Sequence, residues 1–288
     1  MRRGHVGHRA RVIDGVAVRT RGRDVAGDRS LRWAVRAEWT KVRTLPGPAW
    51  LLVAVVVLTV ALSATAAAVV PCAAAGCGQD ATRISLIGVQ LGQAMVALLA
   101  VLTVCGEYST GMIRTSLTAM PRRVTALAAK GVVVTGLTLA AGSVAVLGSV
   151  LAGRLILPGS GYTPAHGYPP LSLADGPTLR AAAGSVLYLA LIGLLSLGLA
   201  TAVRDSAAAT GVVLGLLYAF PFAILVVRDP DVQRLLWTIS PTNAGLTVQA
   251  TTDLPGFPIG PWAGLGVLAA WAVAALLGGG LLLSRRDA

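Results

Sequence analysis

Charged residues are scarce in this chain, and their scarcity excludes most classes of soluble protein. Of 288 residues only 12% are charged, 55% are hydrophobic, and the mean hydropathy is +0.73. A soluble domain of this length carries roughly twice that share of charge. The composition therefore predicts an all-α fold, a polytopic integral membrane protein with no separate soluble domain between its spans.

Metal ligands and disulfide-forming residues are also few. The chain has three cysteines, Cys72, Cys77 and Cys105, and three scattered histidines, His5, His8 and His166. This spacing matches neither a metal site nor a disulfide framework. Cys72 and Cys77 fall in one expected outer loop, where an oxidising compartment permits a disulfide that the spacing does not require. We expect no metal and no cofactor bound by this chain.

Catalytic motifs are missing as well. A phosphate-binding loop needs a lysine after glycine, in G-x-x-x-x-G-K-[ST]. The two lysines, Lys41 and Lys130, follow Thr40 and Ala129 instead. No H-E-x-x-H motif, G-x-S-x-G motif or carboxylate pair is present in the sequence. We therefore predict that this chain is not an enzyme and does not hydrolyse ATP by that route.

What the chain has in abundance is long apolar runs. Six of them approach the length of about 20 residues that a bilayer requires. They lie at residues 49–70, 84–105, 125–151, 181–203, 207–227 and 262–283, within a transmembrane domain at 49–283. Lys130, in the third run, is the one charged residue inside them. Ion-coupled transporters normally need ionisable groups there, so the pattern disfavours a self-powered transporter or pump.

The distribution of basic residues predicts the orientation. Nineteen of the 24 lysines and arginines fall on the side of the expected membrane that holds both termini. The positive-inside rule then makes both termini cytoplasmic. The strong preference for arginine over lysine is typical of a bacterial gene of high GC content, so we expect a multi-pass protein of the bacterial plasma membrane. The arginines are not interleaved with aromatics on a folded face, and we expect no nucleic-acid partner.

The N-terminal region divides into two parts. Residues 1–29 are predicted to form a disordered basic cytoplasmic tail. Residues 30–48 predict an amphipathic helix at the lipid headgroups, ended by Pro46-Gly47-Pro48. Its apolar arc consists of Leu31, Val35, Trp39, Val42 and Leu45, edged by Arg32, Arg36 and Arg43. The alternative interpretation is an ordinary basic flank.

A charged stretch separates the second and third runs. It reads E-Y-S-T-G-M-I-R-T-S-L-T-A-M-P-R-R from Glu107 to Arg123 and holds one of only two glutamates in the chain. Apolar residues recur in it at near-helical spacing, with Arg114 and Arg122 placed to meet a partner. We predict a cytoplasmic coupling segment at 106–124. A basic membrane anchor without a partner is the alternative.

The outer side is expected to carry loops at 71–83, 152–180 and 228–261, and residues 284–288 form a short cytoplasmic tail. The middle loop is too rich in proline for a regular element. The apolar patch from Leu235 to Pro241 is too short to cross, which predicts short re-entrant helices in the last loop. In the second span, Gln90 and Gln93 are expected to form hydrogen bonds between helices rather than to contact substrate.

Three stretches resemble permease subunits of the type-2 ATP-binding-cassette (ABC) exporter family, in its actinobacterial branch. R-A-E-W-T-K-V-R at 36–43 is similar to the E-W-x-K-x-R that opens the family's connecting helix. Glu107–Arg123 resembles E-Y-x-x-G-T-I-R-x-x-L…P-R-R, with Met112 where threonine is common. A third, shorter likeness is S-P-T-N-A-G at 240–245.

The resemblance implies a function that the residues alone do not. Such a permease would pair with a second copy or a paralogue, and separate ABC ATPase subunits would bind ATP and magnesium. The residues expected to couple to the ATPase are Glu107, Gly111, Arg114, Pro121, Arg122 and Arg123. Glu38, Trp39 and Lys41 would anchor the connecting helix in contact with membrane lipid.

The expected activity is outward movement of a hydrophobic or amphipathic substrate, such as a drug, an antibiotic or a lipid-like molecule. The loop at 228–261 would correspond to the family's re-entrant helices at the exit. The alternative is a membrane regulatory or immunity protein that binds a soluble cytoplasmic partner without transporting anything.

Overall fold

The structure, a computed structural model, describes residues 31–72, 77–109, 123–252 and 254–285. Within these ranges the chain is helical and contains no strand. A helix at 31–44 comes first. It is followed by α2 (Pro46–Val69), α3 (Ala81–Ser85), α4 (Val89–Ser109), α6 (Arg123–Ile156), η1 (Leu157–Ser160), η2 (Pro164–His166), α7 (Gly176–Val203), α8 (Ser206–Val226), α9 (Pro230–Ile239), α10 (Pro241–Leu246), η3 (Thr247–Gln249), η4 (Leu254–Gly256) and α11 (Pro261–Arg285).

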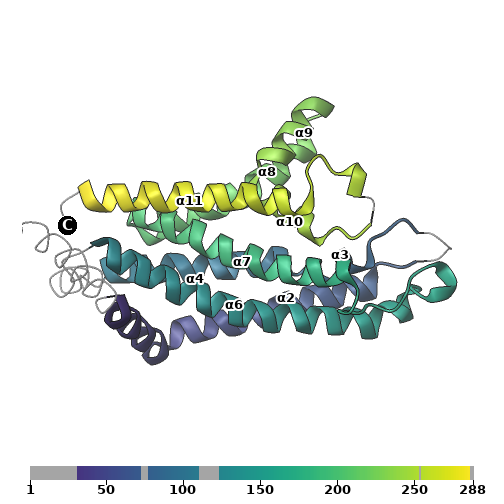
Figure 1. Cartoon of the computed structure of the whole chain (residues 1–288), viewed down its shortest axis with the longest axis horizontal. Coiled ribbons are helices and arrows are strands. Elements are labelled where there is room, and N and C mark those ends of the chain that lie inside the picture. Colours follow the sequence, from purple (N-terminus) through teal and green to yellow (C-terminus); the bar gives the residue numbers. More distant parts are fainter. Residues whose placement is uncertain (1–30, 73–76, 110–122, 253, 286–288) are drawn as a thin grey trace, which may run out of the picture.

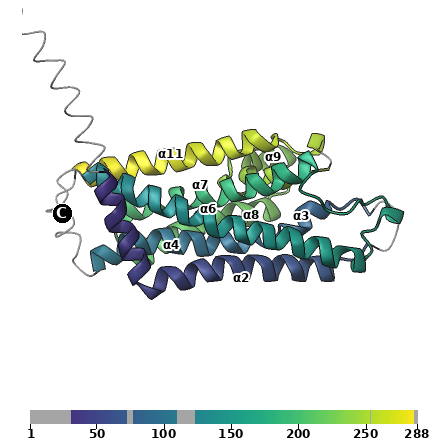
Figure 2. The same cartoon turned by 60° about the horizontal axis from the view of Figure 1, so that its bottom comes forward.

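Six of these helices are long and apolar enough to cross a membrane: α2, α4, α6, α7, α8 and α11. They run alongside one another along the long axis of the molecule (Figure 1 and Figure 2). The prediction of an all-α protein with six spans is confirmed. The tail expected at 1–29 lies outside the described residues.

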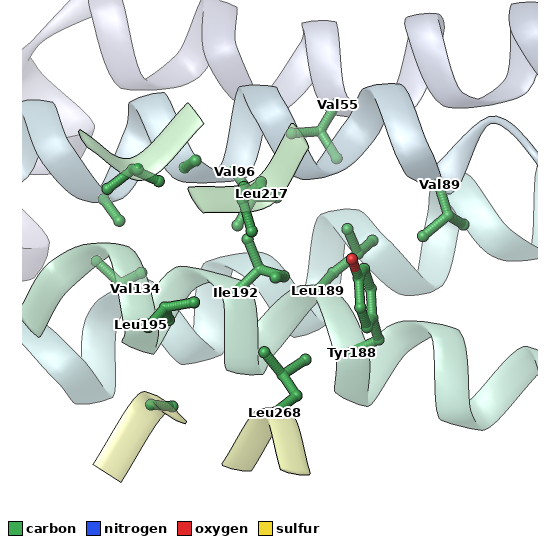
Figure 3. Packing of buried hydrophobic residues seen from close by; sticks show 14 of the residues in the cluster. Val55, Val89, Val96, Val134, Tyr188, Leu189, Ile192, Leu195, Leu217 and Leu268 are labelled. Atoms are coloured by element: carbon green, nitrogen blue, oxygen red, sulfur yellow. The ribbon is translucent and has the colours of Figure 1, made fainter. Parts of the chain in front are cut away.

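Helices α4 and α7 form the centre of the bundle. In each of these two helices, 61% of an apolar stretch of 18 residues is buried inside the protein. The buried share of the corresponding stretch is 22% for α2 and α11 and 17% for α8. Tyr188 and Ile192 of α7 pack with Val96 of α4, Leu217 of α8 and Leu268 of α11, all of them buried (Figure 3). Because lipid tails are as apolar as these side chains, close packing rather than exclusion of water stabilises such a core.

The junction between the helix at 31–44 and α2 differs slightly from the sequence prediction. The helices separate at Leu45, which is extended, and Pro46 and Pro48 lie in the first turn of α2. Proline is tolerated there because the first amide groups of a helix have no intrahelical acceptor. The first span therefore begins at Pro46 rather than at residue 49.

The second span is interrupted, which the sequence analysis did not predict. Residues 86–88 form a turn between α3 and α4 instead of continuing one helix from residue 84. The amide of Gly88 donates to Ser63 Oγ of α2, 3.1 Å away. A Cβ at Gly88 would overlap the carbonyl oxygen of Thr59. Glycine therefore allows α2 to approach the backbone at the point where the helix breaks.

The proline-rich loop after α6 has more regular structure than expected. Helix α6 continues to Ile156, beyond the predicted end at residue 151, and the 3-10 turns η1 and η2 follow it. Pro158 is the second residue of η1 and Pro164 the first residue of η2, positions where the absence of an N–H is tolerated. Helix α7 also begins at Gly176, inside the predicted loop. The prediction that residues 152–180 contain no regular element was therefore wrong at both ends of the loop.

A disulfide joins Cys72 and Cys77, the pair that the sequence left undecided. The amide of Cys72 donates to the carbonyl of Ser160, 2.8 Å away, so Cys72 is attached to η1, the turn that follows α6. Cys105 in α4 is free and buried.

This pairing predicts the thiol count of the protein. When the protein is denatured and treated with a maleimide polymer, one thiol, Cys105, is expected to react before reduction, and all three after it. The band shift on a gel measures the count. A Cys105→Ala variant should show no shift until it is reduced. Three reactive thiols in the unreduced wild-type protein would show that the disulfide is absent.

Candidate functional site

One end of the bundle gathers most of the residues that the sequence analysis singled out. The helix at 31–44, the end of α4, the start of α6 and the end of α11 lie there together, at the left of Figure 1. We call this the basic end, because Lys41, Lys130, Arg123 and Arg285 belong to these elements.

A buried ion pair holds the helix at 31–44 against the bundle. Glu38 Oε2 accepts from Lys130 Nζ of α6 at 3.1 Å, and Glu38 Oε1 accepts from Lys41 Nζ at 3.0 Å. Glu38 is 6% exposed and Lys130 is 7% exposed. Lys130 also donates to the carbonyl of Thr103 in α4, 3.1 Å away. These bonds tie three elements of the basic end together.

The cost of burying charge explains this arrangement. An ionised group removed from water is tolerated when a counter-charge and hydrogen bonds satisfy it. Lys130 lies inside an apolar span, where burying an ammonium group costs free energy. Glu38 offsets this cost by supplying a carboxylate from a separate helix. Both residues were candidates from the sequence, but their pairing was not predicted. A lone charge within a span normally has a partner of opposite sign, and this rule could have indicated the pair.

The helix at 31–44 packs against the bundle through residues that lie outside its apolar arc. Ala34 and Glu38 are the buried positions, whereas Trp39 is 45% exposed and Leu45 is 53% exposed. Trp33 is exposed too, with the guanidinium of Arg36 5.6 Å from its ring centroid. Exposed tryptophans flanked by arginine suit the headgroup layer of a membrane.

The predicted coupling segment is only partly described. Helix α4 continues through Glu107 to Ser109, and α6 begins at Arg123, but the side chains of Glu107 and Arg123 are not among those described. Gly111, Arg114, Pro121 and Arg122 lie outside the described residues. Glu107 follows Thr103 by one helical turn. The ion pair therefore lies one turn from the start of the charged segment.

The opposite end of the bundle holds a short buried helix. In α10, five residues of Pro241–Leu246 are buried, and the helix packs among α7, α8 and α11. Ser240 caps it by accepting from the amide of Asn243 at 3.1 Å. Thr242 Oγ1 donates to the carbonyl of Leu217 in α8 at 2.9 Å. The third family-like stretch, 240–245, thus coincides with this cap and helix.

Residues 250–252, which follow α10 and η3, form hydrogen bonds with two side chains, one before α3 and one in α7. Asp80 accepts from Thr251 Oγ1 at 2.8 Å and from the amide of Thr252 at 3.1 Å. Arg180 of α7 donates to the carbonyl of Ala250 at 2.6 Å. Asp80 also caps α3 through the amide of Arg83. Sequence reasoning missed Asp80, because its partners lie about 170 residues away along the chain.

The two glutamines of α4 form hydrogen bonds to other helices in different ways, Gln93 through its side chain and Gln90 through its backbone. Gln93 is fully buried and accepts from the hydroxyl of Tyr188 in α7, which is the interhelical bond expected for it. The side chain of Gln90 is exposed, and its backbone carbonyl accepts from the hydroxyl of Tyr218 in α8 at 2.6 Å. These bonds join α4 to α7 and to α8 within the apolar bundle.

The described part of the chain holds no cluster of three or more His, Cys, Asp or Glu side chains that could bind a metal ion. The fold defines a multi-pass α-helical membrane protein with six spans. No protein-family profile matches the chain, and no curated protein is significantly similar to it. The likeness to ABC permeases therefore rests on the three stretches of sequence quoted above.

Proposed function

We propose that this chain is the permease subunit of an ABC exporter, driven by a separate ATPase. The observation that carries the proposal is the buried Glu38–Lys130 pair with the Thr103 carbonyl. This pair joins the helix at 31–44, which we call the interfacial helix, to α4 and α6, the two spans that flank the charged segment 107–123. A permease without its own ATP site needs such a mechanical connection, because force must enter from a partner.

The basic end is suited to receive that force. A displacement of the helix at 31–44 would be carried to α4 and α6 together, because both are bonded to the same buried pair. We place the ATPase contacts on Glu107, Gly111, Arg114, Pro121, Arg122 and Arg123, with Glu38 and Lys41 anchoring the interfacial helix. ATP and magnesium would bind to the partner, and a second permease copy or paralogue would complete the transporter.

The opposite end is suited to close the exit. Helix α10 is buried among three spans, and the chain after it is fastened by Asp80 and Arg180. An outward path would open when these contacts separate. We infer a hydrophobic or amphipathic substrate, moved from the cytoplasmic side, where both termini lie, across a bacterial plasma membrane. This chain contributes no covalent chemistry to the cycle.

The test is purification of the tagged full-length protein from its native membrane in mild detergent. We expect an ATPase with a phosphate-binding loop to copurify in near-stoichiometric amount. Arg114→Glu is expected to lower its recovery at least tenfold while the permease stays in the membrane. Arg228→Glu, an exposed arginine at the other end of the bundle, is the matched control and should leave recovery unchanged.

Two results would overturn the proposal. If the protein purifies from its native membrane without any ATPase, transport would have no source of energy. A soluble partner that is not an ATPase would favour the regulatory or immunity function, for which the basic end would serve as a docking site without transport.

A further inference from the structure

A groove runs along the outside of the bundle at the basic end, on the side of α6 away from Glu38. It has a volume of about 600 Å³ and is formed mainly by α6, with Leu194 of α7 and Leu276 of α11. The residues that line it are Val124, Leu127, Ala128, Gly131, Val132, Thr135, Gly136, Leu139, Leu194 and Leu276. Thr135 is the one polar side chain among them.

Small residues create this hollow. A Cβ at Gly136 would meet no heavy atom within 4 Å, and one at Gly131 would only touch leucine side chains at 3.7 Å. From Val124 to Leu139 the groove follows α6 for about 22 Å, at 1.5 Å per residue. One leaflet of hydrocarbon is about 15 Å thick, half of the bilayer core. The groove is therefore long enough for one acyl chain of one leaflet.

Positive charge lies at the end of the groove that faces the membrane surface. The exposed Arg285 ends α11, and Gly280 of the same helix lies beside Leu127 of the groove. Basic residues beside an apolar cleft between membrane helices favour lipids with anionic headgroups. The combination of a hydrocarbon-lined groove and a cation at one end matches an acidic amphiphile in both shape and charge.

We propose that this groove binds an anionic phospholipid of the adjacent leaflet, with one acyl chain along α6 and its phosphate near Arg285. The site goes beyond the proposed transport function, because lipid binding needs no ATPase and no substrate. It also lies on the same turn of α6 as the ion pair: Lys130 bonds Glu38, and the next residue, Gly131, lines the groove. A bound lipid would thus support α6 from the side opposite to the interfacial helix.

The first experiment measures phospholipid retained by the detergent-purified protein, by mass spectrometry. We expect about one anionic phospholipid per wild-type chain, enriched over the composition of the membrane. Gly136→Leu fills the groove and should lower retention at least fivefold. Gly266→Leu is the matched control, since it also adds a leucine at an open, exposed position on a span, outside the groove. It should retain lipid like the wild type.

Charge is tested separately. In nanodiscs containing equal amounts of phosphatidylglycerol and phosphatidylcholine, Arg285→Gln is expected to lower the preference for phosphatidylglycerol at least threefold. Retained lipid with the composition of the bulk membrane would overturn the anionic site. Equal retention by Gly136→Leu and the wild type would overturn its location in the groove.

A measurement on the wild-type protein removes any dependence on how the variants fold. A phosphatidylglycerol with a photoactivatable acyl chain should crosslink to residues 124–139 of α6. Crosslinks confined to other helices would overturn the proposal. Lipid retention without a copurifying ATPase would leave this site intact and remove only the transport function.

Discussion

Replacing Glu38 with glutamine is expected to destabilise the protein by about 3 kcal/mol, the cost typical of removing one partner from a buried ion pair. Glutamine keeps the size of the side chain but removes the negative charge 3.1 Å from the buried ammonium of Lys130. Reversible unfolding in mixed micelles, followed by tryptophan fluorescence, measures the change. The helix at 31–44 should also become accessible to protease.

The partners of Glu38 provide the controls. Lys41 is 33% exposed, so Lys41→Gln should cost less than about 1 kcal/mol. Lys130→Gln combined with Glu38→Gln should cost clearly less than the sum of the two single changes, because the two side chains interact. Additive losses would mean that the pair contributes nothing to holding the interfacial helix, and the mechanical argument for the proposed function would fail.

Replacing Gly264 with valine is expected to have the second-largest effect, a loss of about 2 kcal/mol from overpacking. A Cβ at Gly264 in α11 would overlap the carbonyl oxygen of Ala244 and crowd Thr247 Oγ1. Backbone atoms cannot move aside as a flexible side chain can, so α10 must shift away from α11. Hydrogen–deuterium exchange over residues 241–250 should rise, and the thermal midpoint should fall.

Gly266→Val is the matched control for this change. It lies on the same helix two residues later, with nothing within 4 Å of the added Cβ. Since valine is the better helix former, this variant should be as stable as the wild type or slightly more stable. Equal exchange in both variants would show that α10 does not depend on close contact with α11.

Several elements could be predicted from local sequence because their causes are local. The apolar runs are long enough to span a membrane whatever surrounds them. The helix at 31–44 stops just before Pro46, because proline disfavours a helical conformation in the residue before it. The patch from Leu235 to Pro241 was too short to cross, and the structure has α9 ending at Ile239 and α10 beginning at Pro241. In each case a property of a few consecutive residues was sufficient.

Other features could not be predicted because they depend on residues far apart in the chain. The break before α4 arises where Gly88 meets Thr59 and Ser63 of α2. Asp80 is one of several acidic residues near helix starts, and only folding brings Thr251 to it. The buried face of the helix at 31–44 also depends on a distant residue. Because Lys130 pairs with Glu38, Glu38 is buried against the bundle, and Trp39 is left 45% exposed.

Local sequence is sufficient to predict a helical protein with six spans, because hydrophobic length and the absence of charge decide membrane insertion segment by segment. The basic residues and the three family-like stretches are also readable from the sequence alone, and so is the lack of a phosphate-binding loop. How the spans fit together became clear only in the folded molecule: which charge pairs with which, where glycines allow helices to touch, and where a groove remains open. These outcomes depend on distances between segments separated by tens to hundreds of residues, and no local pattern encodes those distances.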